Sequence, residues 1–403
     1  MKTGLLGRKL GHSYSPQIHD LLGSYRYELF EKEPEEVGDF LKSGDFDAIN
    51  VTIPYKQTVI PYCAELSDAA KRIGAVNTII RRPDGSLIGH NTDYFGFQST
   101  VQRSGLSVAD KKALIIGSGG ASKPVSAVME HLGADTLVIS HKENTPENLA
   151  NHADAAILVN ATPVGMYPNN GESPVDLTLF PRLEGVVDLI YNPAKTKLML
   201  DAEKRGLPVI GGLWMLVAQA KESSEWFTGT AISDDVIEPI HRHLTAQMEN
   251  IVLIGMPGSG KSTIGSALST HLGREFIDTD AEIVKAAGMT IPEIFAQSGE
   301  VGFRQIETEV LALLGKRSGL VIATGGGCVT QERNYPLLHQ NSKIFCLERD
   351  LDQLPIDGRP LSQQNKLEDM YRIRKPMYLR FADYMIDNNG DPDKTVSQII
   401  SKL

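Results

Sequence analysis

The stretch GMPGSGKST, residues 255–263, decides the fold of the second half of this chain. It matches the pattern G-x-x-x-x-G-K-S/T and follows the apolar run at residues 251–254. A helical pattern comes next, with Ile264 and Leu268 on one apolar face. A strand, a glycine-rich loop and a helix in this order are typical of a phosphate-binding loop, whereas a chance glycine-rich turn lacks this context. The sequence therefore predicts a nucleotide site near the middle of the chain.

This loop has the groups needed to hold a nucleotide and its metal ion. Its glycines let backbone N–H groups close around phosphate oxygens. Lys261 would reach the β- and γ-phosphates, and the Ser262 hydroxyl would hold Mg²⁺. The residues expected to bind the nucleotide are Gly255, Gly258, Ser259, Gly260, Lys261, Ser262 and Thr263.

Length and composition bound the class of protein. The chain has 403 residues, more than one hydrophobic core usually serves, so two or three domains are expected. Its composition is 41% hydrophobic and 22% charged, which is ordinary for a soluble globular protein. No apolar run approaches the ~20 residues of a membrane span. The first residues carry one apolar pair and then charge, unlike a secretory signal.

The net charge and the cysteine content indicate which classes of partner and which cellular compartment to expect. The net charge is −10 and no long cluster of lysine and arginine is present, which argues against a nucleic-acid partner. Local arginines must therefore bind any anionic substrate. Cys63, Cys328 and Cys346 are far apart and fit no metal-binding spacing, so a reducing, cytoplasmic compartment is expected. No oligomeric state is predicted.

Short β-rich runs alternate with helical patterns along the whole chain, which predicts an α/β protein with parallel sheets. Residues 101–211 read as a nucleotide-binding series of strands and helices, and residues 212–245 read as helices. We expect three domains: residues 1–100 completed by helices of about 212–243, residues 101–211, and residues 249–403. The boundary has no Gly/Pro/Ser-rich linker, so the two halves are expected to sit close together.

A second glycine-rich turn follows the apolar run at residues 112–116 and precedes a helix. It reads G-S-G-G-A-S, so Ser122 occupies the place of the third glycine of G-x-G-x-x-G. Two glycines still allow the tight turn and the close approach of backbone to a pyrophosphate at the helix N-terminus. The residues expected to bind a dinucleotide here are Gly117, Gly119, Gly120 and Ala121.

The tip of the next strand bears on the choice of dinucleotide. About 20 residues after the glycine turn, an NAD-binding protein usually has an acidic residue that bonds the ribose. This chain has Ser140, His141 and Lys142, a hydroxyl, an imidazole and an ammonium, which favour NADP(H). The alternative is an exposed polar loop with no ligand.

Six motifs occur in order along the first half. They are GHSYSPQIH at 11–19, NVTIPYK at 50–56, GAVNT at 74–78, NTD at 91–93, NATPVGM at 160–166 and MLVAQA at 215–220. Together they resemble shikimate dehydrogenase across residues 1 to about 243. The resemblance implies a substrate-binding domain, a Rossmann-like NADP-binding domain, and NADPH-dependent reduction of 3-dehydroshikimate to shikimate.

The resemblance also assigns the residues of the reaction. Lys56 and Asp93 would lie beside the reacting oxygen, where an ammonium can donate a proton and a carboxylate can hold it in place. Without the resemblance, a weak surface salt bridge would be the better interpretation of this pair. Ser13 and Ser15 would bind the substrate carboxylate, although hydroxyl and amide side chains are more often caps or turn residues. The residues assigned to the ring hydroxyls are Thr52, Asn77 and Gln219.

Two acidic residues follow the phosphate loop in the run FIDTD at residues 276–280. Alternation along a strand would place Asp278 and Asp280 on the same side, near the γ-phosphate. One of the two could then hold Mg²⁺ while the other orients or deprotonates an attacking hydroxyl, and Asp278 is the one that we expect to hold the metal. Because a helical pattern follows directly, Asp280 could instead be a helix N-cap.

Four further motifs complete the second half: GEVGFRQIE at 299–307, TGGG at 324–327, GRPL at 358–361 and RKPMY at 374–378. Together with the phosphate loop they resemble shikimate kinase over residues 249–403. The resemblance implies a P-loop domain like that of nucleoside monophosphate kinases. It also implies ATP- and Mg²⁺-dependent phosphorylation of shikimate to shikimate 3-phosphate.

The resemblance gives the kinase side chains their roles. Arg304 and Arg374 would clamp the substrate carboxylate with planar guanidinium groups, although isolated arginines are usually solvated. Asp280 would contact the ring hydroxyls as the base. Arg359 would neutralise the transferring phosphoryl group from a mobile lid, which here is short and lacks the upstream arginine of many members. The backbone expected to approach the substrate is that of Gly325, Gly326 and Gly327.

The two resemblances are chemically consistent, because the product of the first reaction is the substrate of the second. We therefore expect a bifunctional cytoplasmic enzyme of the shikimate pathway. One alternative is a working dehydrogenase whose kinase-like half only binds nucleotide and regulates. Another is a dehydrogenase that also oxidises quinate.

Overall fold

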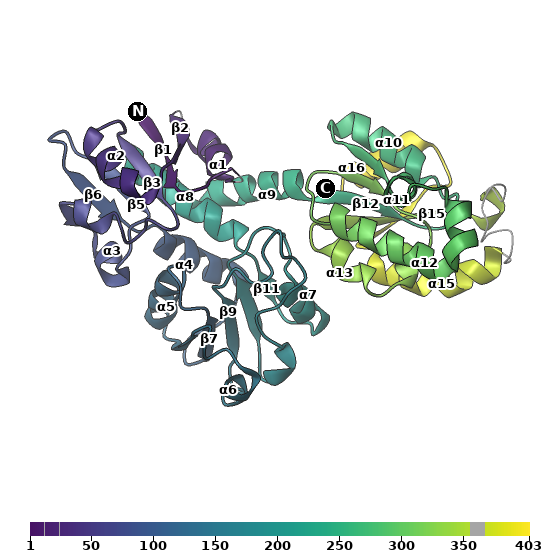
Figure 1. Ribbon diagram of the computed structural model, residues 1–403, viewed down its shortest axis with the longest axis horizontal. Coiled ribbons are helices and arrows are strands. Elements are labelled where there is room, and N and C mark those ends of the chain that lie inside the picture. The colour runs from purple at the N-terminus through teal and green to yellow at the C-terminus, as the bar shows by residue number, and fades with distance from the viewer. Residues whose placement is uncertain (12, 24, 355–366) are drawn as a thin grey trace. The chain divides into compact units, whose positions relative to one another are not determined.

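The computed structural model covers residues 1–11, 13–23, 25–354 and 367–403, and it contains two compact units (Figure 1). Unit 1 comprises residues 1–166, 172–191 and 201–243. Unit 2 comprises residues 244–403 together with two short segments, 167–171 and 192–200. Unit 1 contains two sheets and unit 2 contains one.

The first sheet of unit 1 has six strands in the order β2-β1-β3-β5-β6-β4. The strands are β1 (Lys2–Gly7), β2 (Arg26–Glu31), β3 (Ala48–Val51), β4 (Glu65–Leu66), β5 (Thr78–Arg81) and β6 (Leu87–His90). Strand β1 runs parallel to both β2 and β3, but β5 runs antiparallel to β3 and to β6. The prediction of parallel sheets throughout is wrong for this sheet. A five-residue turn joins β5 directly to β6, and so short a connection can only join antiparallel strands.

Three short helices accompany this sheet: α1 (Ser15–Leu22), α2 (Val37–Ser43) and α3 (Asp68–Ile73). The core between α2 and the sheet is aliphatic and aromatic, with Leu6, Phe46, Ile49 and Ile79 almost fully buried. This packing fixes the loops that follow β1 and β3, which carry the predicted substrate-binding residues.

The second sheet of unit 1 is parallel and has the order β11-β10-β9-β7-β8. Its strands are β7 (Lys112–Ile116), β8 (Asp135–Ile139), β9 (Ile157–Asn160), β10 (Gly185–Asp188) and β11 (Val209–Ile210). Residues 113–116, 157–160 and 185–188 are buried without alternation, as expected for strands covered on both faces. The accompanying helices are α5 (Ser122–His131) and α6 (Pro146–Ala150), and helix α7 (Lys197–Lys204) begins in a segment of unit 2 and ends in unit 1.

Two long helices of unit 1, α4 (Asp93–Ser104) and α8 (Leu213–Thr228), cross at close range (Figure 1). A Cβ atom on Gly96 would lie 2.9 Å from both the Met215 carbonyl oxygen and the Gln219 Cβ, so only glycine permits this approach. The crossing brings Gln219 close to the first turn of α4, where Asp93 lies. Helix α9 (Ile237–Met248) follows and spans the predicted boundary between the two halves.

The sheet of unit 2 is parallel and has the order β13-β14-β12-β15-β16. Its strands are β12 (Asn250–Ile254), β13 (Phe276–Asp278), β14 (Val321–Ala323), β15 (Ser342–Glu348) and β16 (Tyr384–Asp387). The helices are α10 (Lys261–Leu272), α11 (Thr279–Ala287), α12 (Ile291–Leu314), α13 (Asn334–His339), α15 (Leu367–Phe381) and α16 (Pro392–Ile400). The strand, loop and helix predicted around residues 251–272 are present as β12 and α10.

Among the described residues, no helix combines the length and the apolar character needed to cross a lipid bilayer. The three cysteines form no disulfide; Cys63 is half-buried, and Cys328 and Cys346 are buried. Burial raises the thiol pKa of Cys63 to about 11 and that of Cys328 and Cys346 to about 12. All three thiols therefore stay protonated at neutral pH.

We predict that Gly4→Ala destabilises unit 1, because the parallel pairing of β1 with β2 leaves no room for a side chain at residue 4. The new Cβ atom would lie 2.2 Å from the Glu28 carbonyl oxygen and 2.6 Å from the Phe30 ring. Overpacking of this kind costs about 1–3 kcal/mol. Calorimetric unfolding of unit 1 should move to lower temperature. Gly11→Ala is the control, since no atom lies within 4 Å of its new Cβ; equal effects of the two changes would contradict the prediction.

Candidate active sites

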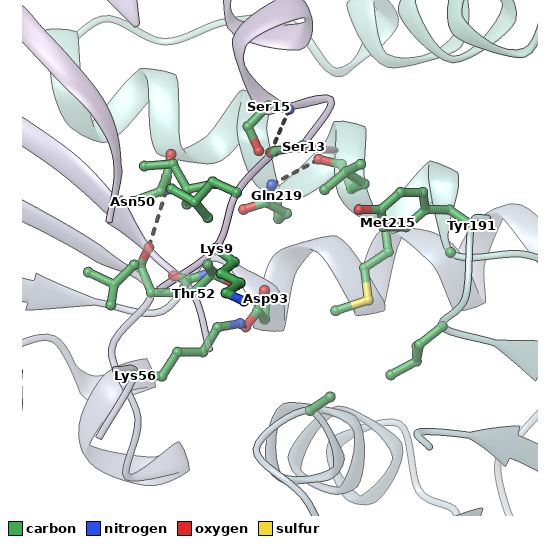
Figure 2. Close-up of a pocket in the computed structure, with 18 of the residues that line it drawn as sticks. Lys9, Ser13, Ser15, Asn50, Thr52, Lys56, Asp93, Tyr191, Met215 and Gln219 are labelled. Atoms are coloured by element: carbon green, nitrogen blue, oxygen red, sulfur yellow. Dashed lines mark hydrogen bonds and ion pairs between the residues drawn. The ribbon is translucent and has the colours of Figure 1, made fainter. Parts of the chain in front are cut away.

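Unit 1 contains a cavity of about 460 Å³ in which most of the predicted dehydrogenase residues meet (Figure 2). Its walls come from the loops after β1, β3, β7 and β10 and from helices α4 and α8. The predicted residues that line it are Ser13, Ser15, Thr52, Lys56, Asn77, Asp93, Ala121 and Gln219. The sequence analysis did not single out Lys9, Asn50, Tyr191 and Met215, which also line it.

The charged centre of this cavity is the pair Lys56–Asp93. The Lys56 ammonium donates a hydrogen bond of 2.7 Å to the Asp93 carboxylate, and both side chains are largely shielded, at 22% and 12% exposure (Figure 2). Lys56 lies just beyond β3, and its carbonyl oxygen accepts the Val76 N–H at 2.7 Å. Asp93 is the first residue of α4, where the helix dipole favours a negative charge. The arrangement holds an ammonium with a proton to donate at the cavity wall.

A buried polar network fixes the neutral side chains of the cavity. Asn77 donates from its amide to the Thr92 hydroxyl at 3.0 Å and accepts the Thr92 backbone N–H at 2.8 Å. The Thr92 hydroxyl also lies 3.3 Å from the Gln219 amide oxygen. Asn50 donates to Ser223 at 2.7 Å, which links β3 to α8. Because these polar side chains hydrogen-bond to one another, the amide groups of Asn77 and Gln219 are held in fixed orientations at the cavity wall.

Ser13 and Ser15 lie at the N-terminal end of α1. The Ser13 hydroxyl accepts the Ser15 backbone N–H at 3.2 Å, and Ser15 begins the helix and is followed by Pro16. Two hydroxyl groups at a helix N-terminus suit an anion such as a carboxylate. Neighbouring His12 lies outside the described residues.

Helix α1 is anchored by an aromatic stack around His19. The imidazole is fully buried, stacks on Tyr27 with ring centroids 4.0 Å apart, and lies 5.7 Å from Phe227. Its Nδ1 is 2.6 Å from the Tyr25 hydroxyl. Burial lowers the pKa of His19 from 6.5 to about 3, because the charged ring would lose its hydration. The neutral ring is therefore the form that the fold requires.

We predict that unit 1 loses stability in acid through His19. The unfolded chain takes up a proton near pH 6.5, whereas the folded chain does so only near pH 3, so stability falls between these values. The loss is about 1.4 kcal/mol per pH unit. Denaturant unfolding of unit 1 at pH 7.5 and pH 5 should therefore show a smaller difference in His19→Gln than in the natural chain. His131→Gln removes an exposed histidine and should keep the natural pH dependence; an unchanged dependence in His19→Gln would contradict the role of His19.

The predicted dinucleotide turn has the geometry that a pyrophosphate needs. Gly117 has φ of 108°, and a Cβ there would lie 2.8 Å from the Thr162 methyl group. Gly119 and Gly120 have open space where a side chain would be, directly before α5. Backbone N–H groups there are accessible to a diphosphate at the helix N-terminus. Of the predicted cofactor residues, only Ala121 reaches the dehydrogenase cavity itself.

The tip of β8 exposes His141 and Lys142, and the neighbouring acid is turned back onto the chain. The Glu143 carboxylate accepts the Ser140 backbone N–H at 2.9 Å, and hydrogen bonding to the side chain and then the backbone of Ser140 lowers the pKa of Glu143. His141 and Lys142 are both exposed, so the Lys142 ammonium is accessible at this tip. This distribution fits a 2′-phosphate better than a free ribose hydroxyl.

Unit 2 contains a cavity of about 890 Å³ at the carboxyl ends of its strands. The phosphate loop forms one wall. Gly255, Gly258 and Gly260 have φ of 141°, 86° and 93°, and a Cβ on Gly255 would lie 2.6 Å from the Leu347 carbonyl oxygen. The predicted residues that line the cavity are Gly258, Gly260, Lys261, Ser262, Thr263, Asp278, Asp280, Arg304, Gly325, Gly326, Gly327 and Arg374.

Lys261 is held inside the phosphate loop. Its ammonium donates to the carbonyl oxygens of Gly255 at 3.0 Å and Met256 at 2.9 Å. Buried Ser259 lies outside the cavity, and its carbonyl oxygen accepts the Asn388 amide at 2.7 Å. Asn388, which follows β16, therefore supports the phosphate loop through Ser259. The side of the loop that lines the cavity stays accessible to phosphate oxygens.

The two acidic residues after β13 are arranged differently from the prediction. The strand ends at Asp278, and Asp280 lies in the first turn of α11, so strand alternation does not relate them. Asp278 is the N-cap: its carboxylate accepts the Asp280 backbone N–H at 3.0 Å. This cap ends the strand and starts the helix, which corrects both the shared strand and the N-cap role considered for Asp280. Both carboxylates still line the cavity, and the Ser262 hydroxyl donates to Asp278 at 2.7 Å.

An arginine clamp faces the glycine run after β14. Arg304 donates to Glu307 at 2.8 Å and to Glu300 at 3.2 Å, and a Cβ on Gly327 would lie 2.0 Å from the Arg304 guanidinium. Arg374 donates to the Gly326 carbonyl oxygen at 3.1 Å. The glycines are needed because the guanidinium groups lie directly against the backbone.

Glu307 is a cavity residue that the sequence analysis missed. It is fully buried, and burial raises its pKa while Arg304 lowers it. The sequence could have indicated Glu307, because it is three residues after Arg304, a predicted site residue, and residues three apart on a helix share a face. Arg359, predicted in the lid, lies outside the described residues, as does most of the lid itself.

These two sites define the class of protein. A dinucleotide-binding sheet beside a lysine–carboxylate pair is the machinery of an oxidoreductase. A phosphate loop beside paired carboxylates and arginines is the machinery of a P-loop kinase.

Comparison with known families identifies the two halves. The family model of the shikimate dehydrogenase substrate binding domain matches residues 5–79, and that of shikimate kinase matches residues 257–403. The shikimate dehydrogenase (NADP(+)) of Clostridium beijerinckii is 37% identical over 244 residues, which cover 55% of this chain and 90% of that protein. The chain therefore belongs to the shikimate dehydrogenase family and carries a shikimate kinase domain in its second half. It combines two enzymes of the shikimate pathway.

Solved structures agree with this assignment. A chorismate mutase/shikimate 5-dehydrogenase fusion protein from Clostridium acetobutylicum is 35% identical with a TM-score of 0.57, over 60% of this chain and 96% of that chain. A shikimate 5-dehydrogenase from Thermus thermophilus, in complex with NADP(H) and shikimate, is 30% identical with a TM-score of 0.55, over 60% of this chain and 99% of that chain. The predicted α/β fold, with a dehydrogenase region and a kinase domain, is confirmed.

Proposed function

We propose that this chain catalyses two consecutive reactions at the two cavities described above. In unit 1, 3-dehydroshikimate is reduced to shikimate with NADPH. In unit 2, shikimate is phosphorylated by ATP to shikimate 3-phosphate. The observation that carries the proposal is that each cavity joins reactive side chains to a cofactor turn. In unit 1 the Lys56–Asp93 pair shares a cavity with Ala121, at the end of the dinucleotide turn, and in unit 2 the phosphate loop shares a cavity with two carboxylates and two arginines.

In the dehydrogenase cavity, bound NADPH supplies the hydride. Lys56 donates the proton to the ketone oxygen and stabilises the negative charge that develops there. Asp93, 2.7 Å away, holds the ammonium in place. Ser13 and Ser15 bind the substrate carboxylate. The ring hydroxyls are held by Thr52, Asn77 and Gln219, of which the two amides are fixed by the buried network.

NADP(H) fits the residues of the second sheet. Gly117, Gly119 and Gly120 leave room for the pyrophosphate, and Ala121 joins the turn to the substrate cavity. We propose that Ser140, His141 and Lys142 hold the 2′-phosphate, which the engagement of Glu143 with Ser140 favours.

In the kinase cavity, bound MgATP supplies the phosphoryl group. Lys261 and the phosphate-loop N–H groups bind its phosphates. The Ser262 hydroxyl and Asp278 carboxylate, 2.7 Å apart, are oxygen donors of the kind that Mg²⁺ prefers. Arg304 and Arg374 bind the substrate carboxylate, and Asp280 orients or deprotonates the hydroxyl. Arg359 contributes from the lid.

We propose that the enzyme is cytoplasmic, since its three cysteines are free thiols. The three domains proposed are residues 1–100 with helices of about 212–243, residues 101–211, and residues 249–403.

The decisive experiment is a pair of substitutions assayed for both reactions. Lys56→Ala should reduce ketone reduction by about 10²-fold or more, because the proton donor is lost, and leave phosphorylation of shikimate intact. Lys261→Ala should abolish phosphorylation and leave reduction intact. Joint loss of both activities in either variant would contradict two separate sites.

The same assays separate the alternatives. If the kinase-like half only regulates, the natural chain will show no shikimate-dependent ATP turnover although it binds nucleotide. If the dehydrogenase also accepts quinate, turnover of quinate will approach that of shikimate with NADP or NAD.

We predict that Asp278→Asn weakens the response of the kinase to Mg²⁺, because one charged oxygen donor becomes neutral. The Mg²⁺ concentration that gives half-maximal phosphorylation should rise, and the dehydrogenase rate should not change. The measurement is phosphorylation rate against free Mg²⁺ at saturating ATP. A normal Mg²⁺ response would exclude Asp278 as a metal-binding residue.

A further inference from the structure

Arg349 is a cavity residue of unit 2 to which the functions above assign no role. It directly follows strand β15 and lines the kinase cavity beside the phosphate loop. Its Nε is shielded from solvent and has no hydrogen-bond partner. Among residues 1–354 and 367–403, apart from 12 and 24, no hydrogen bond or ion pair of the Arg349 side chain is found. The Nε of Arg304 is also shielded without a partner, but Arg304 donates through its two terminal nitrogens, and Arg374 donates to the Gly326 carbonyl oxygen.

An Nε–H donor that is shielded from solvent and lacks an acceptor is unfavourable in the free protein. A guanidinium cannot lose its proton to escape the cost, since it stays charged at any ordinary pH. Leaving a shielded charged donor without an acceptor costs free energy that an incoming anion would recover. The side chain is therefore poised for an anionic ligand.

The order of the strands indicates which ligand lies near Arg349, the nucleotide phosphates or the carboxylate of the acid substrate. Strand β15 is hydrogen-bonded to β12, which carries the phosphate loop, and lies on the opposite side of β12 from β14 and β13. The carboxylate clamp, Arg304 against Gly327, follows β14. The residues just before Arg349 contact the phosphate loop instead, since the Leu347 carbonyl oxygen lies against Gly255.

A second contact ties the same segment to the phosphate loop. The Glu348 carbonyl oxygen accepts the Asn388 N–H at 2.8 Å, and the Asn388 amide donates to the Ser259 carbonyl oxygen at 2.7 Å. Arg349 is therefore fixed relative to the loop that receives the phosphates, with the β12 strand between it and the carboxylate clamp.

We propose that Arg349 is a nucleotide-binding residue of the kinase, whose guanidinium donates hydrogen bonds to the polyphosphate of bound ATP. This role rests on the proposed kinase function. A planar fork with several N–H donors suits two phosphate oxygens at once, which a lysine ammonium does not match.

The test is calorimetric titration of the full chain with ADP, together with kinase kinetics, in Arg349→Met and Arg349→Lys. A lost charge-assisted hydrogen bond should raise the Kd for ADP by about ten- to hundredfold in Arg349→Met, with a smaller rise in Arg349→Lys. The KM for ATP should rise in parallel while the KM for shikimate stays unchanged. Arg372→Met is the matched control, because its side chain is 80% exposed and lies outside the cavity.

The outcomes are distinct. Natural affinity for ADP in both Arg349 variants would overturn the role of Arg349 and leave the kinase function intact. A raised KM for shikimate with unchanged ADP binding would move Arg349 to the acid-binding site and also overturn the proposal. Absence of shikimate-dependent ATP turnover in the natural chain would instead contradict the proposed kinase function, while its ADP titration would still report on Arg349. If Arg349→Met fails to fold, the weakened ADP binding expected of Arg349→Lys decides the question.

Discussion

Parallel pairing of neighbouring strands is the constraint on which both cavities depend. In unit 1, β1 and β3 run side by side, so the loops after them, with Ser13 and Lys56, open on the same edge. In unit 2, β12 pairs with both β14 and β15, so three loops meet around one cavity. Because backbone hydrogen bonds set the register, the reactive side chains are positioned by the least adjustable part of each unit.

The two cavities use charge in different ways. In the dehydrogenase, Lys56, the proposed proton donor, is already paired with Asp93, so a substrate would meet a preformed pair. In the kinase, Arg304 is neutralised by Glu307 from its own helix. The kinase cavity must accommodate a more highly charged pair of ligands, and it has more cationic side chains to do so. Pairing inside the protein keeps these charges stable before any ligand arrives.

Sequence patterns predicted the structures that form between residues close together in the chain. The strand, phosphate loop and helix at residues 251–272 occur within about 20 residues, and the chemistry of glycine and lysine explains them without tertiary information. The antiparallel β5–β6 pair was missed because the overall alternation of strands and helices concealed one short turn. Asp280 was placed on a strand because a period of two was extended across a helix start that Asp278 caps.

Contacts between residues far apart in the chain could not be predicted from the sequence alone. Asn50 and Ser223 are 173 residues apart, yet they share a buried hydrogen bond that supports the substrate cavity. The close crossing at Gly96 likewise depends on a helix more than a hundred residues away. Arg349 carries no motif, and only its shielded, unpartnered Nε distinguishes it from a solvated arginine.

The buried thiols have a practical consequence. Thiolate is the form that reacts with maleimides and iodoacetamides, and burial keeps Cys63, Cys328 and Cys346 protonated. A cysteine introduced on an exposed helix would therefore react much faster than any natural one. The natural sequence is therefore already a suitable background for attaching a dye to a chosen site in either half.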